Sequence, residues 1–290
     1  MIKKIEYLGF PNCIELGNGV VNLIISTDFG PRVLFYGFDG GENILGWHGE
    51  AAVQTEIGTW KPYGGHRLWL APENMPLSYS PDNDPVGFIE DGEFSIRLIP
   101  PEDVHANVQK ELTITIDETG SGVTLDHKIT KRGDVSIKAS AWALTIMRPG
   151  GTAVVPHEPF QPYSSTTLLP VRTMAMWSYT DFTDPRWGFE KSEIRLRVDE
   201  QIDSQQKFGV FNRQGWAGYE WGNLRFAKHF DVDENAEYPD MNSNTEIYTA
   251  GGFVEIETLS PLRTIAPGDS IFHQERWELQ FKAAGHAQGQ

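Results

Sequence analysis

Alternation of apolar and polar residues with a period of two is the feature that most restricts the folds open to this chain. It recurs in ELTITID (111–117), VTLDHKIT (123–130), VSIKASAWALTIM (135–147), EIRLRVD (193–199), FVEIETL (253–259) and ERWELQF (275–281). This spacing places successive side chains on opposite faces of a β-strand, and the 3.6-residue spacing of an amphipathic helix is nearly absent. Turn sequences such as KRGD, RPGG and APGDS separate the segments. We therefore predict an all-β, antiparallel fold of the sandwich or barrel kind.

Nothing in the composition divides the chain into separate parts. The 290 residues contain no linker rich in proline, serine or glycine and no repeat of fixed length. All-β domains of about 200–250 residues are common. We predict a single β-sandwich domain over residues 1–290, with its core at about residues 15–282. Two irregular segments, residues 72–88 and 148–190, are long enough to carry function.

The charge of the chain argues against several classes of partner. Its 24 Lys and Arg residues stand against 40 Asp and Glu residues, a net charge of −16, which repels nucleic acid and anionic membrane surfaces. We expect neither as a partner. The one cysteine, Cys13, allows no internal disulfide, and no apolar run is long enough for a signal peptide or a membrane span. We expect a cytoplasmic protein, and the sequence leaves its oligomeric state open.

Two glutamates in FVEIETL form the first candidate for chemistry. Glu255 and Glu257 are two residues apart in a strand pattern, so their side chains share a face. They could simply be solvated on an exposed strand. On the floor of a polar cleft one could instead act as a general base, since a neighbouring negative charge raises a carboxyl pKa. Two acids flanking a glycosidic bond would serve a glycosidase equally well.

The second candidate is the segment YGGHRLWLAPE (63–73), in which a histidine and an arginine follow two glycines. In an extended segment His66 and Arg67 point to opposite faces, so only one of them can line a given site. A histidine can donate a proton near neutral pH, and an arginine can hold hydroxyl or ring oxygens with its planar donors. The alternative is structural: Arg67 pairs with a carboxylate and His66 caps a turn.

Several kinds of site are not indicated by any motif. The eight histidines form no HxH or HExxH pair, so we expect no metal. The chain also lacks a GxSxG elbow, a phosphate-binding P-loop and a GxGxxG dinucleotide motif. We expect no cofactor. The many tryptophans, among them Trp69 and Trp142, offer flat faces that could stack on sugar rings, although most should lie in the core.

The order of these features resembles the galactose mutarotase-like superfamily, which includes the aldose 1-epimerases. The likeness extends from about residue 15 to 282 and is strongest in YPDMNSNTEIYTAGGFVEIETLSPLRTIAPGDS (238–270). It implies a β-supersandwich that binds an aldose on a concave sheet face and opens the ring with a glutamate base and a histidine acid. The family's catalytic glutamate followed by threonine corresponds to Glu257 and Thr258. The early Gly-Gly segment, similar to that of the hexose-phosphate epimerases, implies that His66 and Arg67 lie near the sugar.

The chain departs from the family's pattern at the histidine acid. Typical mutarotases carry an Asn-His pair on a central strand, where this sequence has Ala141 and Trp142. The resemblance therefore indicates a divergent branch in which His66 replaces the missing acid and Glu257 is the base. The sugar-binding residues that it implies are Arg67, Glu255, Trp142, Trp69, Glu73 and Tyr248.

Three functions remain open at this point. The chain could be an epimerase that interconverts sugar anomers, a carbohydrate-binding protein without catalysis, or a glycoside hydrolase or lyase. Its partner would be a small sugar or an oligosaccharide. The sequence does not name the sugar, and a phosphorylated one would need a local positive patch such as Arg67, Lys228 and Arg263.

Overall fold

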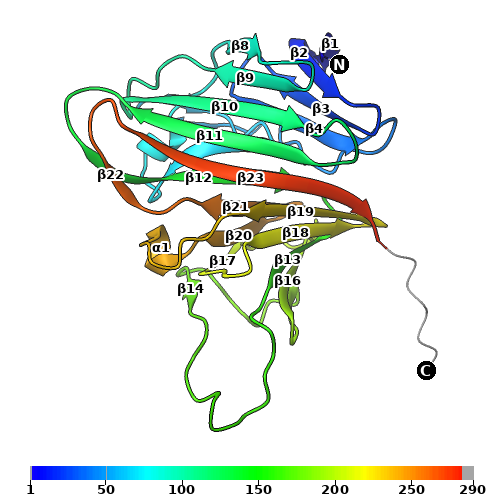
Figure 1. Ribbon diagram of the computed structural model, residues 1–290, viewed down its shortest axis with the longest axis vertical. Coiled ribbons are helices and arrows are strands. Elements are labelled where there is room, and N and C mark those ends of the chain that lie inside the picture. The colour runs from blue at the N-terminus through cyan, green and yellow to red at the C-terminus, as the bar shows by residue number, and fades with distance from the viewer. Residues whose placement is uncertain (1, 50, 283–290) are drawn as a thin grey trace.

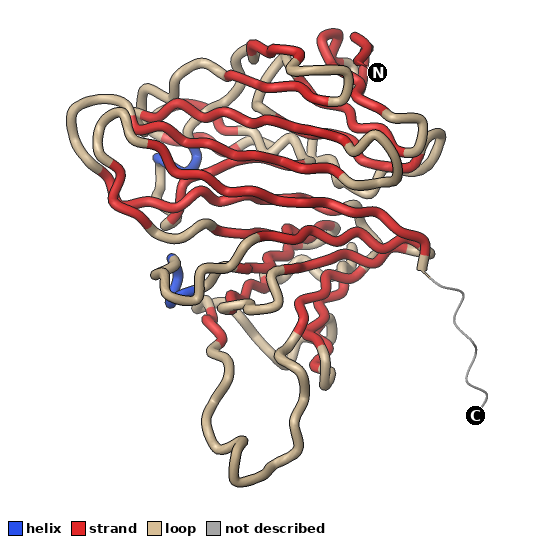
Figure 2. Tube along the Cα trace, in the orientation of Figure 1, coloured by secondary structure: helices blue, strands red, loops and turns tan. Residues whose placement is uncertain are grey.

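The structure is a computed structural model that describes residues 2–49 and 51–282. Nearly all of its regular structure is β-strand (Figure 2), and most strands lie in two large antiparallel sheets (Figure 1). The all-β antiparallel fold predicted from the sequence is confirmed. Each of the six alternating segments lies mainly in a strand of these sheets. The single domain over residues 1–290 stays a prediction.

Among the described residues the first sheet has eleven strands, and it carries the candidate site. Its order is β1 (Ile2–Tyr7), β2 (Phe10–Gly17), β3 (Val21–Ser26), β4 (Arg32–Phe38), β7 (His66–Ala71), β12 (Ile137–Met147), β21 (Phe253–Leu259), β20 (Thr245–Ala250), β17 (Gln206–Val210) and β14 (Met174–Met176). The strand β22 (Arg263–Ile265) also pairs with β12. Segments distant in the sequence, such as β7 and β21, therefore lie on either side of β12.

The second sheet has ten strands in the part of the chain that the structure describes. Its order is β15 (Trp187–Phe189), β16 (Glu193–Arg197), β13 (Thr152–Pro156), β18 (Trp216–Trp221), β19 (Leu224–Phe230), β23 (Ser270–Phe281), β11 (Val123–Lys131), β10 (Val108–Ile116), β9 (Ser95–Ile99) and β8 (Gly87–Glu90). The remaining elements are a hairpin of β5 (Val53–Thr55) and β6 (Gly58–Trp60), a 3-10 turn η1 (Leu77–Tyr79) and the short helix α1 (Pro239–Asn242).

The main hydrophobic core lies between the two sheets. On β10, Leu112, Ile114 and Ile116 are buried, and the residues that separate them are partly exposed. Trp277 and Phe226 from the second sheet pack edge to face in the same core. Burial of such aliphatic and aromatic side chains is the main favourable contribution to folding, and the period of two directs them to one face.

The two irregular segments predicted from the sequence contain several short elements. The predicted segment 148–190 contains β13, β14 and β15, and its middle part extends away from the sheets at the bottom of Figure 1. The predicted segment 72–88 contains η1 and the first residues of β8. No helix among the described residues is long and apolar enough to cross a bilayer.

Candidate functional site

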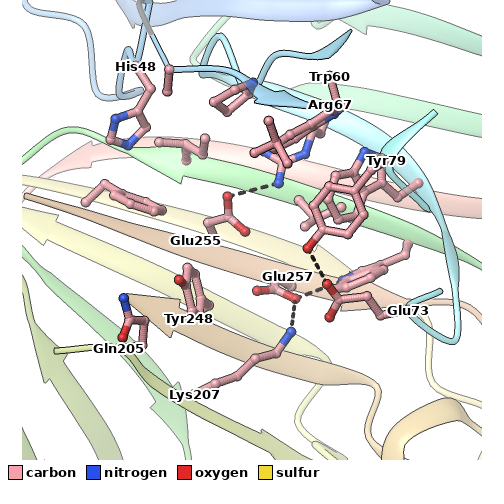
Figure 3. Close-up of a pocket in the computed structure, with 18 of the residues that line it drawn as sticks. His48, Trp60, Arg67, Glu73, Tyr79, Gln205, Lys207, Tyr248, Glu255 and Glu257 are labelled. Carbon is pink, nitrogen blue, oxygen red and sulfur yellow. Dashed lines mark hydrogen bonds and ion pairs between the residues drawn. The ribbon is translucent and has the colours of Figure 1, made fainter. Parts of the chain in front are cut away.

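A cavity of about 530 Å³ opens on the face of the first sheet that is turned away from the core (Figure 3). Much of its wall is aromatic: Trp60, Trp69, Tyr79, Trp142, Tyr179, Tyr248 and Phe253. Its polar side chains are His48, Arg67, Glu73, Gln205, Lys207, Glu255 and Glu257. A concave site with flat apolar faces and a few converging polar groups is the usual form of a small-molecule site.

The strand register gathers these polar side chains in adjacent rows. Antiparallel pairing brings residues of neighbouring strands opposite one another, and residues two apart on a strand share a face. One row contains Arg67, Leu144, Glu257 and Glu246, and the next contains Ile146, Glu255, Tyr248 and Lys207. Residues from five strands, β7, β12, β17, β20 and β21, thus meet on one face.

The two glycines before β7 fix the start of this strand. Gly65 has a φ of +64°, and a Cβ there would lie 1.9 Å from the carbonyl oxygen of Val33. Gly64 has a φ of +137°, and a Cβ there would lie 2.4 Å from the carbonyl oxygen of Gly46. Only glycine fits both the conformation and the close approach. After the two glycines, His66 pairs with Val33 of β4. The next residue, Arg67, points to the opposite face of β7 and lines the cavity.

Glu257 is a fully buried carboxylate on the cavity wall. Its Oε2 accepts hydrogen bonds from Trp142 Nε1 at 2.9 Å and from Lys207 Nζ at 3.1 Å. Its Oε1 has no hydrogen-bond partner among the described residues. Burial raises the pKa of Glu257, and Lys207 opposes that rise. A carboxylate held by one oxygen, with the other unpartnered and a raised pKa, is suited to accept a proton.

Lys207 lies between two carboxylates and two indole rings. Its Nζ is 2.8 Å from Glu246 Oε2 and 4.8 Å and 4.7 Å from the ring centres of Trp142 and Trp177. Burial favours the neutral amine, but Glu246 and Glu257 outweigh it and raise the pKa of Lys207. Burial also raises the pKa of Glu246 well above its ordinary value, against the effect of Lys207. One ammonium neutralises one carboxylate, so we assign a proton to Glu246 and the charge to Glu257.

Arg67 forms the second ion pair of the cavity. Its Nη2 is 3.0 Å from Glu255 Oε1, and its guanidinium lies 4.5 Å from the ring centre of Trp69 and 5.5 Å from that of Trp60. Its Nε and Nη1 have no hydrogen-bond partner in the described part of the chain. Aromatic rings and Glu255 hold the guanidinium in place while two of its nitrogens remain able to donate to a ligand.

Seven of the eight residues proposed from the sequence line this cavity. They are Glu257, Arg67, Glu255, Trp142, Trp69, Glu73 and Tyr248. Glu73 lies at the side of Tyr79, whose hydroxyl donates to it at 2.5 Å. Tyr248 lies beside the two glutamates of β21 in Figure 3, and burial raises its pKa to about 12.

The structure corrects the expectation for His66. Because it precedes Arg67 on β7, its side chain points to the opposite face of the strand, between the two sheets, where it is 0% exposed. Its Nδ1 is 2.9 Å from Thr145 Oγ1, and its Nε2 is 2.7 Å from His127 Nε2. A sugar held beside Glu257 lies on the other side of the sheet, so His66 cannot give a proton to the same ring.

His66 belongs to a group of buried polar residues that we call the inter-sheet cluster. It consists of His66, Thr145 and Thr258 from the first sheet and His127, Lys228, His273 and Glu275 from the second. Glu275 accepts hydrogen bonds from Lys228 Nζ at 2.7 Å, from Trp277 Nε1 at 2.8 Å and from the hydroxyl of Thr258. Lys228 therefore lies here rather than in a phosphate-binding patch of the cavity.

The imidazoles of the inter-sheet cluster are satisfied without an ion. The backbone carbonyl of His273 can only accept, so His127 Nδ1 donates to it at 2.9 Å and His127 Nε2 accepts from His66. Thr145 then donates to the other nitrogen of His66. The ligand atoms of His66, His127 and Glu275 lie within 4.8 Å of one another, as they would around a metal. Because each already has a protein partner, we assign no metal to them.

The inter-sheet cluster predicts a loss of stability in acid. Burial lowers the pKa of His66 and His127, and lowers that of His273 to about 3. In the unfolded chain each would be near 6.5, so below that pH the unfolded state binds more protons and stability falls as the pH falls. Glu246 and Glu257, whose pKa values are raised, act in the opposite direction.

Because Glu246 carries a proton and Glu257 the negative charge, three histidines against one glutamate leave a net uptake of about one proton or more on unfolding. We therefore expect the free energy of unfolding to fall by at least about 1.4 kcal/mol per pH unit below pH 6. Urea unfolding at pH 7.5, 6.0 and 5.0 measures this slope. A stability that stays constant over this range would contradict the neutral, buried state of the imidazoles.

Lys207, His48 and Glu246 are among the residues of the site that were not proposed from the sequence. Lys207, in QQKFGV, and His48, in GWHGE, have no motif around them. Glu246 could have been found, because it alternates with Tyr248 in TEIYTA as Glu255 does with Glu257. His48 lines the cavity with its ring 4.1 Å from that of Phe253, and its Nε2 is buried without a hydrogen-bond partner among the described residues.

Comparison with known proteins supports the fold. No protein-family model matches the sequence, and neither does any curated protein. A galactose mutarotase-like protein from Lactobacillus casei has a similar structure, with a TM-score of 0.60, 9% identity and coverage of 93% of this chain and 100% of that one. A galactose mutarotase related enzyme from Lactobacillus acidophilus has a TM-score of 0.58 and 6% identity, over 94% of this chain and 98% of that one.

A galactose mutarotase-like protein from Clostridium acetobutylicum is also similar, with a TM-score of 0.52 and 12% identity over 97% of this chain and 98% of that one. Each likeness covers nearly the whole of both chains, and each identity is low enough that it speaks for the fold alone. The chain therefore has the galactose mutarotase-like fold, with low sequence identity to each of these structures.

Proposed function

We propose that the cavity binds a saccharide and that the protein interconverts the two anomers of the sugar ring held there. The observation that carries this proposal is Glu257, a buried carboxylate held through Oε2 by Trp142 and Lys207 with Oε1 unpartnered among the described residues. The aromatic wall supports saccharide binding, because the apolar faces of a sugar ring pack on flat rings while its hydroxyls reach the polar groups. The fold supports the same reaction class by analogy.

The reaction needs only proton transfers. Glu257 Oε1 takes the proton of the anomeric hydroxyl, whose oxygen becomes the carbonyl oxygen as the bond between the anomeric carbon and the ring oxygen breaks. An acid gives a proton to that ring oxygen. Rotation about the bond between the first two carbons and the reverse transfers then close the ring on its other face. Holding base, ring and acid in place supplies much of the acceleration, and no cofactor is required.

We assign the acid to His48. Its Nε2 is buried and unpartnered in the described chain, and its ring lines the cavity. Burial lowers the pKa of His48, partly offset by Glu255, so its imidazolium is a stronger acid but is carried by a smaller fraction of the protein at neutral pH. Tyr248 also carries a proton beside the glutamates, but burial raises its pKa to about 12, so it keeps its proton and acts as a hydrogen-bond donor.

The proposal is tested by recording anomer exchange with NMR in a panel of aldoses. Saturation transfer between the signals of the two anomers gives the exchange rate, and the same samples report binding through line broadening. We expect exchange faster than in buffer for at least one aldose. Binding without faster exchange would contradict the catalytic part of the proposal.

His48→Ala is expected to lower the exchange rate by about 100-fold, since removal of a general acid costs about 10²–10⁴-fold. The affinity for the sugar should change far less, because His48 supplies only one edge of the cavity. His229→Ala is the control, since this side chain is exposed on the second sheet. Exchange at the native rate in His48→Ala would remove His48 from the mechanism.

A non-catalytic carbohydrate-binding protein is the second candidate function. It is favoured by the position of Trp142, where mutarotases resembling this chain carry the acid, and by the orientation of His66 away from the cavity. A glycoside hydrolase or lyase is a third and weaker candidate. It alone predicts new reducing ends when the protein is incubated with a polysaccharide.

We place the activity in the cytoplasm. The only cysteine of the chain, Cys13, is buried, and burial raises its pKa to about 11, so it is an unreactive thiol suited to a reducing compartment. The acidic net charge of −16 supports a small-molecule partner rather than nucleic acid or an anionic membrane.

A further inference from the structure

A second hollow of about 620 Å³ adjoins the cavity. Tyr179 and Gln205 line both, so the two spaces meet at these side chains. Beyond them the second hollow is lined by Asp181, Thr183, Ile202 and Ser204. A ligand that fills the cavity can therefore extend on one side into the second hollow. On the way it passes the exposed ring of Tyr179 and the exposed side-chain amide of Gln205.

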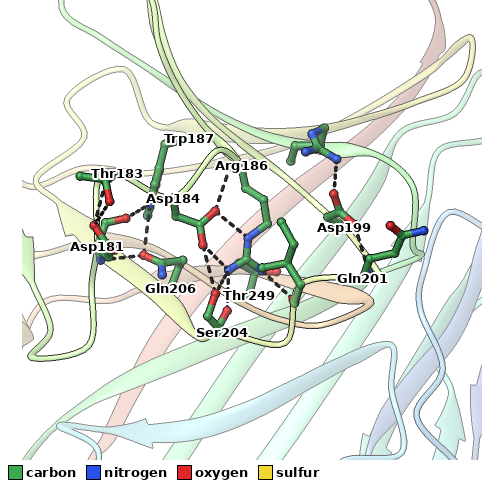
Figure 4. A network of polar contacts seen from close by, with 12 residues as sticks. Asp181, Thr183, Asp184, Arg186, Trp187, Asp199, Gln201, Ser204, Gln206 and Thr249 are labelled. Carbon is green, nitrogen blue, oxygen red and sulfur yellow. Dashed lines mark hydrogen bonds and ion pairs between the residues drawn. The ribbon is translucent and has the colours of Figure 1, made fainter.

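The wall of the second hollow is held by a dense polar network (Figure 4). Arg186 is 2% exposed, and its guanidinium donates to both carboxylate oxygens of Asp184, at 3.0 Å and 2.8 Å, and to Ser204 Oγ at 2.9 Å. The amide oxygen of Gln206 accepts from the backbone of Asp181 at 2.8 Å and from Trp187 Nε1 at 3.2 Å. These contacts hold the segment that contains Asp181, Asp184 and Arg186 against the start of β17.

The chemistry of the second hollow suits an uncharged, hydroxylated ring. Tyr179 offers a flat face that is 43% exposed, and Gln205, Thr183 and Ser204 offer amide and hydroxyl groups. No lysine, arginine or histidine lines it among the described residues, and Asp181 does line it. A negatively charged sugar would be repelled there, because nothing compensates its charge.

We infer that the ligand is an oligosaccharide whose reducing-end ring occupies the cavity and whose next ring occupies the second hollow, an inference that rests on the proposed function. The reducing-end ring must keep its anomeric hydroxyl free to meet Glu257. The link to the next ring therefore leaves through a non-anomeric oxygen, at the side of the cavity bounded by Tyr179 and Gln205. Neutral oligosaccharides meet both conditions, and uronic or sulfated chains do not.

Calorimetric titration of the native protein with matched sugars tests this inference. The probes are glucose, galactose and mannose, each compared with its own 1,4-linked disaccharide and trisaccharide. For the reducing sugar that binds, we expect the disaccharide to bind at least about tenfold more tightly than the monosaccharide, since it adds a stacked ring and several hydrogen bonds. Dissociation constants of monosaccharide and disaccharide within about threefold of one another would overturn the inference.

Two substitutions of Thr183 provide a matched pair. Thr183→Trp fills the second hollow, so we expect it to bring the dissociation constant of the disaccharide to within about threefold of that of the monosaccharide, with monosaccharide binding unchanged. Thr183→Ser keeps the small side chain and the hydroxyl that donates to Asp181 at 2.7 Å, so it should keep the preference for the disaccharide. A preference that survives in Thr183→Trp would place the second ring elsewhere and overturn the inference.

The same samples separate this inference from the proposed function. Anomer exchange of a monosaccharide, without tighter binding of the disaccharide, would support the proposed function and contradict a binding site for a second ring. A disaccharide preference that Thr183→Trp abolishes, without any anomer exchange, would support the oligosaccharide site and contradict catalysis.

Discussion

Glu257→Gln is expected to lower the rate of anomer exchange by about 10³-fold while changing saccharide affinity by less than about threefold. Glutamine has nearly the same shape, and its Oε1 can still accept from Trp142, but an amide cannot take up the anomeric proton. Without the charge of Glu257, Glu246 can ionise and remain the counterion of Lys207, 2.8 Å away. The fold should therefore survive, and NMR exchange with calorimetry on the same protein measures both quantities.

Two further glutamates are controls for this substitution. Glu255 lies on the same strand as Glu257 and is the counterion of Arg67. Glu255→Gln should therefore weaken binding of the sugar more than it lowers the rate of anomer exchange in the bound sugar. Glu237→Gln changes an exposed carboxylate outside the cavity and should have no effect on either. An exchange rate in Glu257→Gln equal to that of the native protein would contradict the assignment of Glu257 as the base. An equal loss of exchange rate in all three variants would contradict it as well.

The strands and the shared faces of this site could be predicted from the sequence. The alternation in FVEIETL places Glu255 and Glu257 on one face, and the adjacency of His66 and Arg67 places them on opposite faces. Which face of a strand is turned to the core could not be predicted. Where both faces are buried, apolar and polar residues do not alternate clearly enough to distinguish the core face from the cavity face. On β12, Ala139 to Met147 are buried without exception. His66 was assigned to the wrong face of β7 for this reason.

The environment of the base could not be predicted either, because it is assembled across the sheet. Trp142 and Lys207 hold Glu257 but are 115 and 50 residues away from it in the chain. Their meeting depends on the order of β12, β21, β20 and β17, which no local pattern specifies. The raised pKa of Glu257 follows from burial and from these neighbours, so it too is a property of the assembled sheet.

Lys228→Met is expected to lower the free energy of unfolding by about 3–5 kcal/mol, because it leaves a buried carboxylate without its cation. Lys228 and Glu275 are both 0% exposed, and Nζ lies 2.7 Å from Oε1. Burial opposes ionisation, but the surrounding groups, of which Lys228 has the largest effect, together hold the pKa of Glu275 well below its usual range. Urea unfolding at pH 7.5 measures the loss.

The double variant Lys228→Met with Glu275→Gln distinguishes the ion pair from simple loss of packing. If the cost of the single change is mainly an uncompensated charge, removing the carboxylate as well should restore part of it, with a coupling of at least about 1.5 kcal/mol. The exposed pair of Lys138 and Glu237, 2.8 Å apart, is the control, and its single variants should change stability by less than about 1 kcal/mol. Additive losses at Lys228 and Glu275 would mean that their charges are not coupled. A positive coupling would instead identify the pair as the electrostatic link between β19 and β23 beneath the strands that carry Arg67 and Glu257.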